Sequence, residues 1–321
     1  MIRLFKNSHP IAIMLLVIIA AIPYYSITTS GWHTTLLIDN KLYLLNFLQI
    51  TGGFFEKPVV LNLLASTAIV VIESLFFNKI INDQKIFDRP GFLPALGYVL
   101  MTSLVPLHYQ SYMLSINGML LLSISNILSV YKKEKVNNSI LIAYFFTGAI
   151  TCFSISYLPL CIWLFISLII MRPTSLREIM LAVTGLVLPF YFLVSILYLS
   201  SNFSQTTIFQ QIKFSITFPQ LDILSWVKIA FFLLMPLLGI LRSNRLVSKM
   251  LIQGRKTYTV MFVLFICSVV INFLSLVNFP FTLYLLVIPS GFLITPLFLS
   301  SKKYFWPNLL LMLLIFLCFL G

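Results

Sequence analysis

Two acidic residues follow the first apolar stretch of the chain and are the strongest candidates for acid–base chemistry. Asp39 and Glu56 belong to the same polar segment, residues 28–57. A carboxylate there would be ionised at neutral pH and could act as a general base toward a lipid-linked donor. The alternative is that Asp39 is a solvated loop acid that pairs with Lys41.

Histidine and cysteine are too scattered to predict a metal site. His33 and His108 could approach each other in the folded chain, but neither belongs to an HxxxH or HExxH pattern. The cysteines lie inside apolar stretches and form no CxxC pair: Cys152, Cys161, Cys267 and Cys318. We therefore expect no metal, no disulfide and no other cofactor.

Ionisable and amide side chains also occur inside the apolar stretches. Glu73 and Lys228 are the ionisable ones, and such groups are candidates for a proton or ion site. The alternative for Glu73 is that it reaches the membrane interface or pairs with Lys79. The alternative for Lys228 is that its apolar methylene groups stay in the membrane while its ammonium group reaches the interface. Asn117 and Asn126 are expected to hydrogen-bond between helices.

The segment 242–258 carries five basic residues and no acid. Arg242, Arg245 and Lys249 are spaced by three and four, so we expect them to share one helical face. Together with Arg255 and Lys256 they could bind anionic lipid headgroups or the phosphate of a lipid-linked precursor. The alternative is that they only set the orientation of the chain in a membrane.

A local motif at 172–178 has a structural interpretation. Ser175 is followed three residues later by Glu178, which is the pattern of a capping box at the start of a helix. The carboxylate would also lie at the positive end of the helix dipole.

The composition decides where all these residues must lie. Of the 321 residues, 60% are hydrophobic and 9% are charged, and the mean hydropathy is +1.03. A soluble protein has about 25% charged residues, so this chain could not cover a soluble fold with polar surface. These values exclude a soluble enzyme, a nucleic-acid binder and a disordered chain. The net charge of +13 therefore does not indicate a nucleic-acid partner.

Continuously apolar segments predict an all-α fold, a polytopic bundle of transmembrane helices in one membrane domain, 1–321. We expect eleven spans at residues 11–27, 58–78, 92–107, 112–131, 140–156, 158–171, 179–200, 223–241, 259–276, 280–299 and 307–320. Span 280–299 contains the most helix breakers, and discontinuous helices build substrate sites in transporters.

The basic residues support this count. With the N-terminus inside, 17 of the Lys and Arg residues fall on inner segments and 3 on outer segments. Cytoplasmic loops collect Lys and Arg, so the pattern predicts an inner N-terminus and an outer C-terminus.

The segments 117–135, 156–192 and 243–256 resemble a family of polytopic inner-membrane proteins from Bacteroidetes that is defined as a domain of unknown function. This resemblance implies a multi-pass protein of the bacterial inner membrane, associated with the cell envelope. The order of spans and the first outer segment are also similar to C-type membrane glycosyltransferases. That resemblance implies a catalytic carboxylate on the first outer loop, here Asp39.

Three functions remain open at this point. The first is a non-catalytic inner-membrane protein that binds or handles a lipid-linked envelope component, or that is a subunit of an envelope assembly. Its partners would be membrane lipids, a lipid-linked glycan precursor or other envelope proteins. The second is a glycosyltransferase that uses Asp39, and the third is a transporter with its site at span 280–299.

Overall fold

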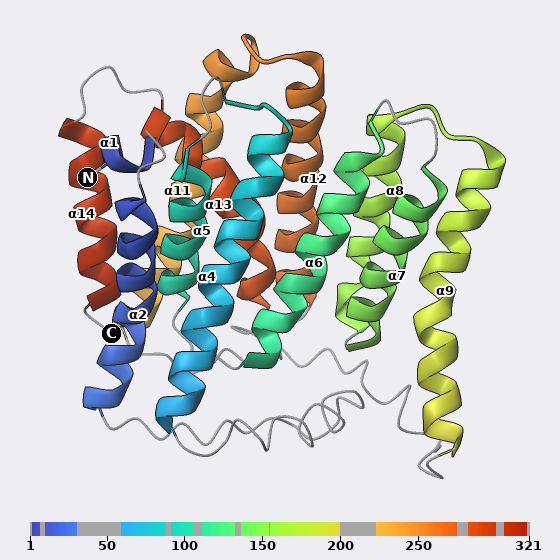
Figure 1. Cartoon of the computed structure of the whole chain (residues 1–321), viewed down its shortest axis with the longest axis horizontal. Coiled ribbons are helices and arrows are strands. Elements are labelled where there is room, and N and C mark those ends of the chain that lie inside the picture. The colour runs from blue at the N-terminus through green and yellow to red at the C-terminus, as the bar shows by residue number, and fades with distance from the viewer. Residues whose placement is uncertain are drawn as a thin grey trace.

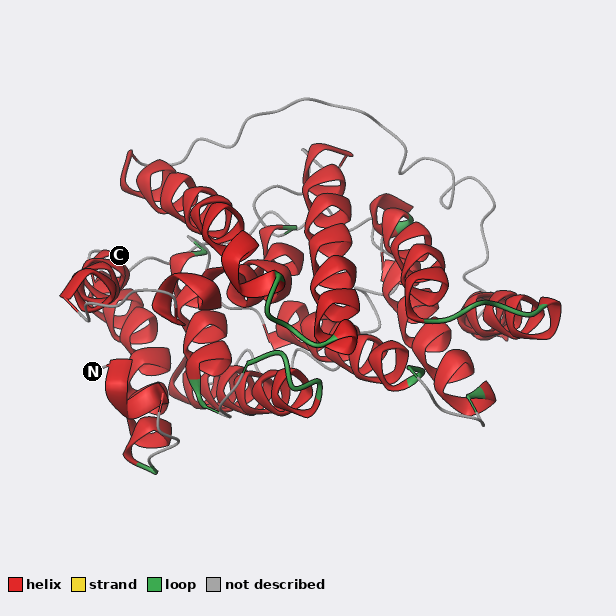
Figure 2. Ribbon diagram, turned by 90° about the horizontal axis from the view of Figure 1, so that it is seen from above, coloured by secondary structure: helices red, strands yellow, loops and turns green. Residues whose placement is uncertain are grey.

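The protein is an all-helical bundle (Figures 1 and 2). The computed structural model describes residues 2–6, 10–30, 59–87, 91–105, 111–131, 136–153, 155–199, 223–274, 282–299 and 305–319. Within these residues there are twelve α-helices and one short 3₁₀ helix, η1 (Ile155–Tyr157), and no strand. The α-helices are α1 (Ile2–Lys6), α2 (Ile11–Ser30), α4 (Val59–Asp83), α5 (Leu93–Leu104), α6 (Ser111–Ser129), α7 (Asn137–Phe153), α8 (Pro159–Met171), α9 (Leu176–Leu199), α11 (Ile223–Val247), α12 (Ile252–Leu274), α13 (Leu283–Leu299) and α14 (Phe305–Phe319).

A helix occupies each of the eleven segments that the apolar pattern predicts as spans. The boundaries differ most where a helix continues into polar sequence. α4 extends to Asp83, α11 extends to Val247, and α12 begins at Ile252. Hydropathy detects only the apolar part of a helix, whereas the backbone hydrogen bonds continue into polar terminal turns.

Four of the described helices are long and apolar enough to cross a membrane. These stretches are Leu64–Asp83, Leu176–Ile196, Ile223–Ser243 and Ile252–Phe273. The remaining apolar helices are shorter, with 10–17 residues each in their described parts. The structure is therefore that of a membrane protein by helix length and composition, while eleven crossings and the orientation of the termini stay predictions.

α13 forms the centre of the bundle, between α5 and α11 and against α12. Leu283 to Pro296 are all buried. The transporter hypothesis relied on a broken helix at span 280–299, whereas α13 is one continuous helix that contains Pro289 and Pro296. Pro289 cannot donate to the Leu285 carbonyl oxygen, and the Ser268 hydroxyl of α12 donates to that oxygen instead (3.5 Å).

Glycines allow α13 to approach its neighbours closely. A Cβ atom on Gly97 of α5 would lie 2.5 Å from the carbonyl oxygen of Gly291. A Cβ atom on Gly239 of α11 would overlap the Leu293 carbonyl oxygen. Small residues at such crossings let helix backbones approach, and the close contact replaces the hydrophobic driving force that a bilayer does not supply.

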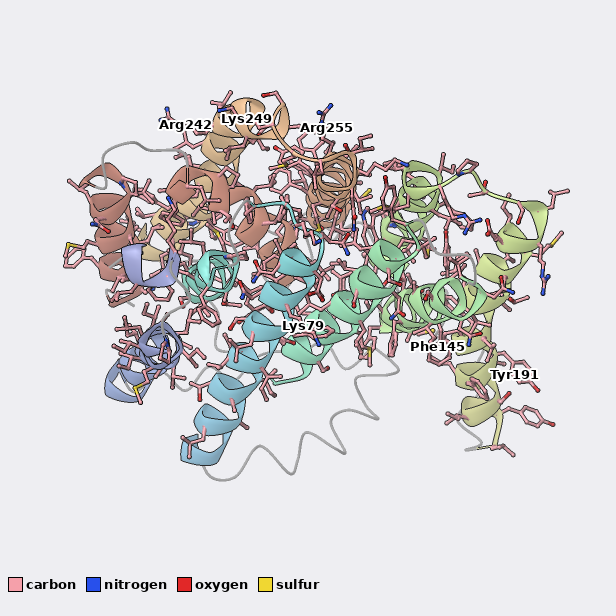
Figure 3. All side chains as sticks on the ribbon, turned by 45° about the horizontal axis from the view of Figure 1, so that its top comes forward. Lys79, Phe145, Tyr191, Arg242, Lys249 and Arg255 are labelled. Carbon is pink, nitrogen blue, oxygen red and sulfur yellow. The ribbon has the colours of Figure 1, made fainter. Side chains whose placement is uncertain are left out.

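α9 lies at the periphery and packs chiefly against α7. Its outer face is apolar and uncovered: Met180 and Tyr191 are each 67% exposed, and Leu199 is 84% exposed. Figure 3 shows Tyr191 projecting away from the bundle. An apolar face of this extent is unfavourable in water but suits contact with lipid.

The basic connections meet at one end of the bundle, at the top of Figure 1. Lys6, Lys85, Lys249 and the α13 terminus at Leu299 line one cavity. Lys256 of α12 donates a hydrogen bond to Met171 at the end of α8, and its ammonium lies over the ring of Tyr131, after α6. Segments that the sequence places on one side of the membrane are thus neighbours in space.

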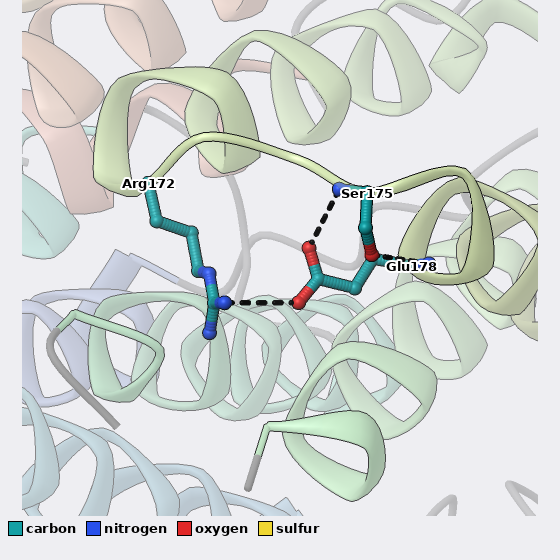
Figure 4. Close-up of polar contacts among 3 residues, drawn as sticks. All are labelled: Arg172, Ser175 and Glu178. Atoms are coloured by element: carbon teal, nitrogen blue, oxygen red, sulfur yellow. Dashed lines mark hydrogen bonds and ion pairs between the residues drawn. The ribbon is translucent and has the colours of Figure 1, made fainter. Parts of the chain in front are cut away.

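The capping box at the start of α9 is confirmed (Figure 4). The Ser175 amide donates to Glu178 Oε2 (3.1 Å), and the Glu178 amide donates to Ser175 Oγ (3.4 Å). Arg172 lies 3.3 Å from the other carboxylate oxygen. Ser175 and Glu178 satisfy backbone donors that the first turn of a helix leaves free, and Arg172 pairs with the Glu178 carboxylate.

We expect Glu178→Ala to destabilise the protein by about 1 kcal/mol, because the box then loses one of its two hydrogen bonds and its ion pair. Thermal unfolding in detergent measures the effect. Arg177→Ala is the control, since Arg177 is exposed beside the box. Equal stability of the two variants would contradict a capping role.

Candidate functional site

A cavity of about 940 Å³ opens at the basic end of the bundle. Three lysines from separate segments contribute to it: Lys6 of α1, Lys85 between α4 and α5, and Lys249 between α11 and α12. The rest of the lining is mostly apolar and includes Ile86, Phe87, Leu93, Leu246, Met250 and Leu299. Cationic groups above an apolar wall are the pattern expected for an anionic amphiphile.

Short backbone contacts bring these segments together. The Phe92 amide donates to the Phe5 carbonyl oxygen (2.8 Å), which holds α1 against the α4–α5 connection. A Cβ atom on Gly91 would lie 3.0 Å from that same oxygen, so a side chain there would press on α1. The side-chain amide of Asn82, in the last turn of α4, donates to the Gly91 carbonyl oxygen (3.2 Å) and so holds this connection against α4.

Lys85 and Lys249 reach the cavity from tight turns. Lys85 has a positive φ of 49°, which turns the chain directly after α4. Lys249 follows α11, and its amide donates to the Leu246 carbonyl oxygen (3.0 Å). The side-chain amide of Gln253, at the start of α12, donates to Gln84 Oε1 (2.8 Å), so the turn after α4 is linked to the start of α12.

An apolar groove of about 810 Å³ lies beside the cavity, between α11, α13 and α14. Within the described part of the chain, Arg242 is the one charged residue that lines it. Leu297 and Phe298 line the groove, and the next residue, Leu299, lines the lysine cavity. The two hollows therefore flank the same end of α13.

The basic segment is not one continuous stripe. Because α11 ends at Val247, Lys249 lies in the following turn, and the prediction that it shares a helical face with Arg242 and Arg245 was wrong. Arg242 lines the groove, whereas Lys249 lines the cavity. Figure 3 shows Arg242, Lys249 and Arg255 around this turn. The side chain of Arg245 lies outside the described residues.

Arg255 and Lys256 are engaged with the protein itself. Arg255 donates to the carbonyl oxygens of Met250 (3.0 Å) and Ser248 (3.5 Å), which stabilises the turn before α12. Lys256 Nζ donates to the Met171 carbonyl oxygen (2.8 Å). Both therefore stabilise the basic end, and neither lines the cavity.

Glu73 lies deeper than the sequence suggested. α4 continues to Asp83, so the carboxyl-bearing residue is about 15 Å from that end of the helix. It is 6% exposed, and the Tyr98 hydroxyl donates to its Oε2 (2.7 Å). Lys79 is exposed, whereas Glu73 is buried. Glu73 therefore neither pairs with Lys79 nor reaches the interface.

The other polar groups within the helices have different surroundings. Lys228 is 7% exposed and lies near Cys318. Asn126 was expected to hydrogen-bond to another helix. It donates instead to the Leu122 carbonyl oxygen of its own helix (2.8 Å). Asn117 is fully buried, and neither polar atom of its amide has a hydrogen-bond partner.

The acid–base candidates of the first outer segment lie outside the described residues, as do the two histidines: Asp39, Glu56, His33 and His108. The hypothesis that Asp39 is a general base therefore stays a prediction. Among the residues that the structure places, no group of three or more His, Cys, Asp or Glu side chains could hold a metal ion. The four cysteines are free thiols.

Sequence reasoning did not single out Lys6 and Lys85 as binding residues. Both were counted only as markers of orientation. The shared signal was that they belong to the inner segments together with Lys249. Their convergence depends on the α1 contact and on the turn at Lys85, which no spacing reveals.

Comparison of this chain with protein-family models, with curated proteins and with solved structures finds no match.

Proposed function

We propose that the protein binds a lipid with an anionic phosphate headgroup at the basic end of the bundle. The observation that carries the proposal is the convergence of Lys6, Lys85 and Lys249 on a cavity whose remaining wall is mainly apolar. Lysine ammonium groups are point charges that pair with phosphate oxygens. The adjoining groove along α13 suits an acyl or isoprenoid chain.

The proposed headgroup site lies on the cytoplasmic side of the bacterial inner membrane. Support comes from the excess of Lys and Arg on the segments that meet there, which is the signature of cytoplasmic loops. The lipid would be an inner-leaflet phospholipid or a polyisoprenyl phosphate that carries an envelope component. Handling such a lipid requires binding and release.

The test compares two double variants that remove the same charge. Lys85→Gln with Lys249→Gln removes two cavity lysines, and Lys79→Gln with Arg177→Gln removes two exposed cations that do not line the cavity. Each lysine near a phosphate contributes about 1 kcal/mol. The cavity variant should therefore bind phosphatidylglycerol about thirtyfold more weakly by native mass spectrometry.

The control variant should bind phosphatidylglycerol as the wild type does, and phosphatidylcholine should not distinguish the proteins. Lipids that remain bound after purification in mild detergent, identified by mass spectrometry, separate a phospholipid from a polyisoprenyl phosphate. Equal losses in both double variants would show that general surface charge, and not this cavity, attracts the lipid.

Orientation is tested by cysteine labelling in intact cells, in a variant whose native cysteines are replaced. We expect Asn137→Cys to react only with a membrane-permeant maleimide, because residue 137 follows the basic segment 131–135. Gln205→Cys should react with an impermeant maleimide. Labelling of position 137 from outside would overturn the proposed topology.

A further inference from the structure

A second polar cluster lies inside the bundle and shares no residue with the lysine cavity. Glu73 of α4, Tyr98 of α5 and Asn117 of α6 come together there, and α13 packs against α5 and α6 beside them. All three side chains are at least nine-tenths buried. The Tyr98 hydroxyl donates to Glu73 Oε2 (2.7 Å) and lies beside the Asn117 amide.

Gly118 makes room for the carboxyl group. A Cβ atom at this position would lie 3.1 Å from Glu73 Oε1. The second carboxyl oxygen is therefore directed at the backbone of α6, next to the residue that bears the unpaired amide. Any larger residue than glycine would press on the carboxyl group.

Among the residues that the structure describes, no positive side chain pairs with Glu73. The ion pair found among the described residues joins Arg172 to Glu178 at the basic end. The sequences of α2, α5, α6 and α13 contain no Lys or Arg, and Lys79 of α4 is exposed. Among the described residues, the Tyr98 hydroxyl donates to Glu73, and Tyr284 of α13 lies near Tyr98. An ionised carboxylate buried in this way would cost several kcal/mol without a bound positive charge.

Asn117 supplies the second observation. Its amide oxygen and nitrogen are both buried and without a hydrogen-bond partner. Buried polar atoms are nearly always paired, so an amide left open beside a carboxyl group indicates a ligand that it would contact. The oxygen could accept from a protonated carboxyl group or coordinate a small cation.

We propose that Glu73, Tyr98 and Asn117 form an intramembrane site for one monovalent positive charge, a proton or a sodium ion. A single carboxylate surrounded by neutral oxygens matches one unit of charge, and the described residues offer no cluster of acids for a divalent ion. Both ligands would neutralise Glu73, and they differ in whether the cluster must open to admit an ion. The site does not depend on lipid binding at the basic end.

A hydrophobic carbodiimide tests the site in the wild-type protein, because it reacts with protonated carboxyl groups in apolar surroundings. The carboxyl group adds across the carbodiimide and rearranges to a stable N-acylurea, which mass spectrometry maps to one residue. We expect an adduct at Glu73 that decreases about tenfold for each pH unit once the carboxyl group ionises. Glu73→Gln should abolish the adduct.

Sodium distinguishes the two ligands. If sodium binds, sodium chloride should protect Glu73 from the carbodiimide, whereas choline chloride at the same concentration should not. If only a proton binds, the two salts should be equivalent. Asp83→Asn removes an exposed acid from the end of the same helix and should leave labelling of Glu73 unchanged.

Thermal unfolding is the second measurement. The wild type should lose stability as pH rises, by at least several degrees in midpoint, because the folded state favours the neutral carboxyl group. Glu73→Gln should lack this dependence. The proposal is overturned if the carbodiimide labels Glu73 at no pH, and if the unfolding midpoints of the wild type and Glu73→Gln change with pH and with sodium in the same way.

Discussion

Gly97→Ala is expected to leave little folded protein in detergent, because the added methyl group would meet backbone rather than a flexible side chain. The new Cβ would lie 2.5 Å from the Gly291 carbonyl oxygen and 2.9 Å from Ile294 Cγ2. α13 cannot move aside, since α11 and α12 pack on its other faces. Overpacking of this kind costs about 3 kcal/mol or more.

Gly254→Ala is the matched control. Gly254 also lies inside a helix, but a Cβ atom there would have its nearest neighbour, Met250 Cβ, at 3.4 Å. Alanine is favoured over glycine in a helix by about 1 kcal/mol, so this variant should be at least as stable as the wild type. Fluorescence-detected size-exclusion chromatography after heating compares the two. If Gly97→Ala survives as well as Gly254→Ala, α5 and α13 do not pack as the structure shows.

Lys256→Met is expected to destabilise the protein by about 2 to 4 kcal/mol while leaving lipid binding unchanged. The ammonium donates to the Met171 carbonyl oxygen (2.8 Å) and lies 5.2 Å from the centre of the Tyr131 ring. A hydrogen bond from a charged group contributes about 1.5 to 3 kcal/mol, and a cation–π contact about 0.5 to 1 kcal/mol. Methionine keeps the apolar stem but removes both interactions.

The measurements are the midpoint of thermal unfolding and the affinity for phosphatidylglycerol. Arg177→Gln, which removes an exposed cation from the same end, should change neither. A Lys256→Met protein of normal stability that binds the lipid more weakly would assign Lys256 to the headgroup site. That outcome would restore the original hypothesis for this residue.

The contrast between Lys249 and Lys256 shows the limit of reasoning from a basic run. Both belong to one segment without acids, and the sequence predicts the same role, binding of a lipid headgroup, for both. The chain reverses between α11 and α12, so Lys249 faces a cavity whereas Lys256 contacts α8. Charge and spacing identify the segment, but the direction of each side chain depends on where the helices end.

Glu73 illustrates the same limit in the apolar region. The apolar stretch ends near residue 78, which suggests a carboxyl group close to an interface. The helix continues to Asp83, and Tyr98 comes from a separate helix to bond with the carboxyl group. A partner twenty-five positions away is brought close by helix packing, and periodicity along one helix contains no information about it.

The sequence by itself determined the class of protein, the position of eleven helices and the capping box at Ser175 and Glu178. These features depend on composition and on contacts a few residues apart, which a linear pattern contains. The tertiary structure alone decided that α13 is continuous and central, that three lysines share a cavity, and that Glu73, Tyr98 and Asn117 meet. Those features arise from packing between helices, where proline-freed carbonyl groups find partners and glycines set the distance of approach.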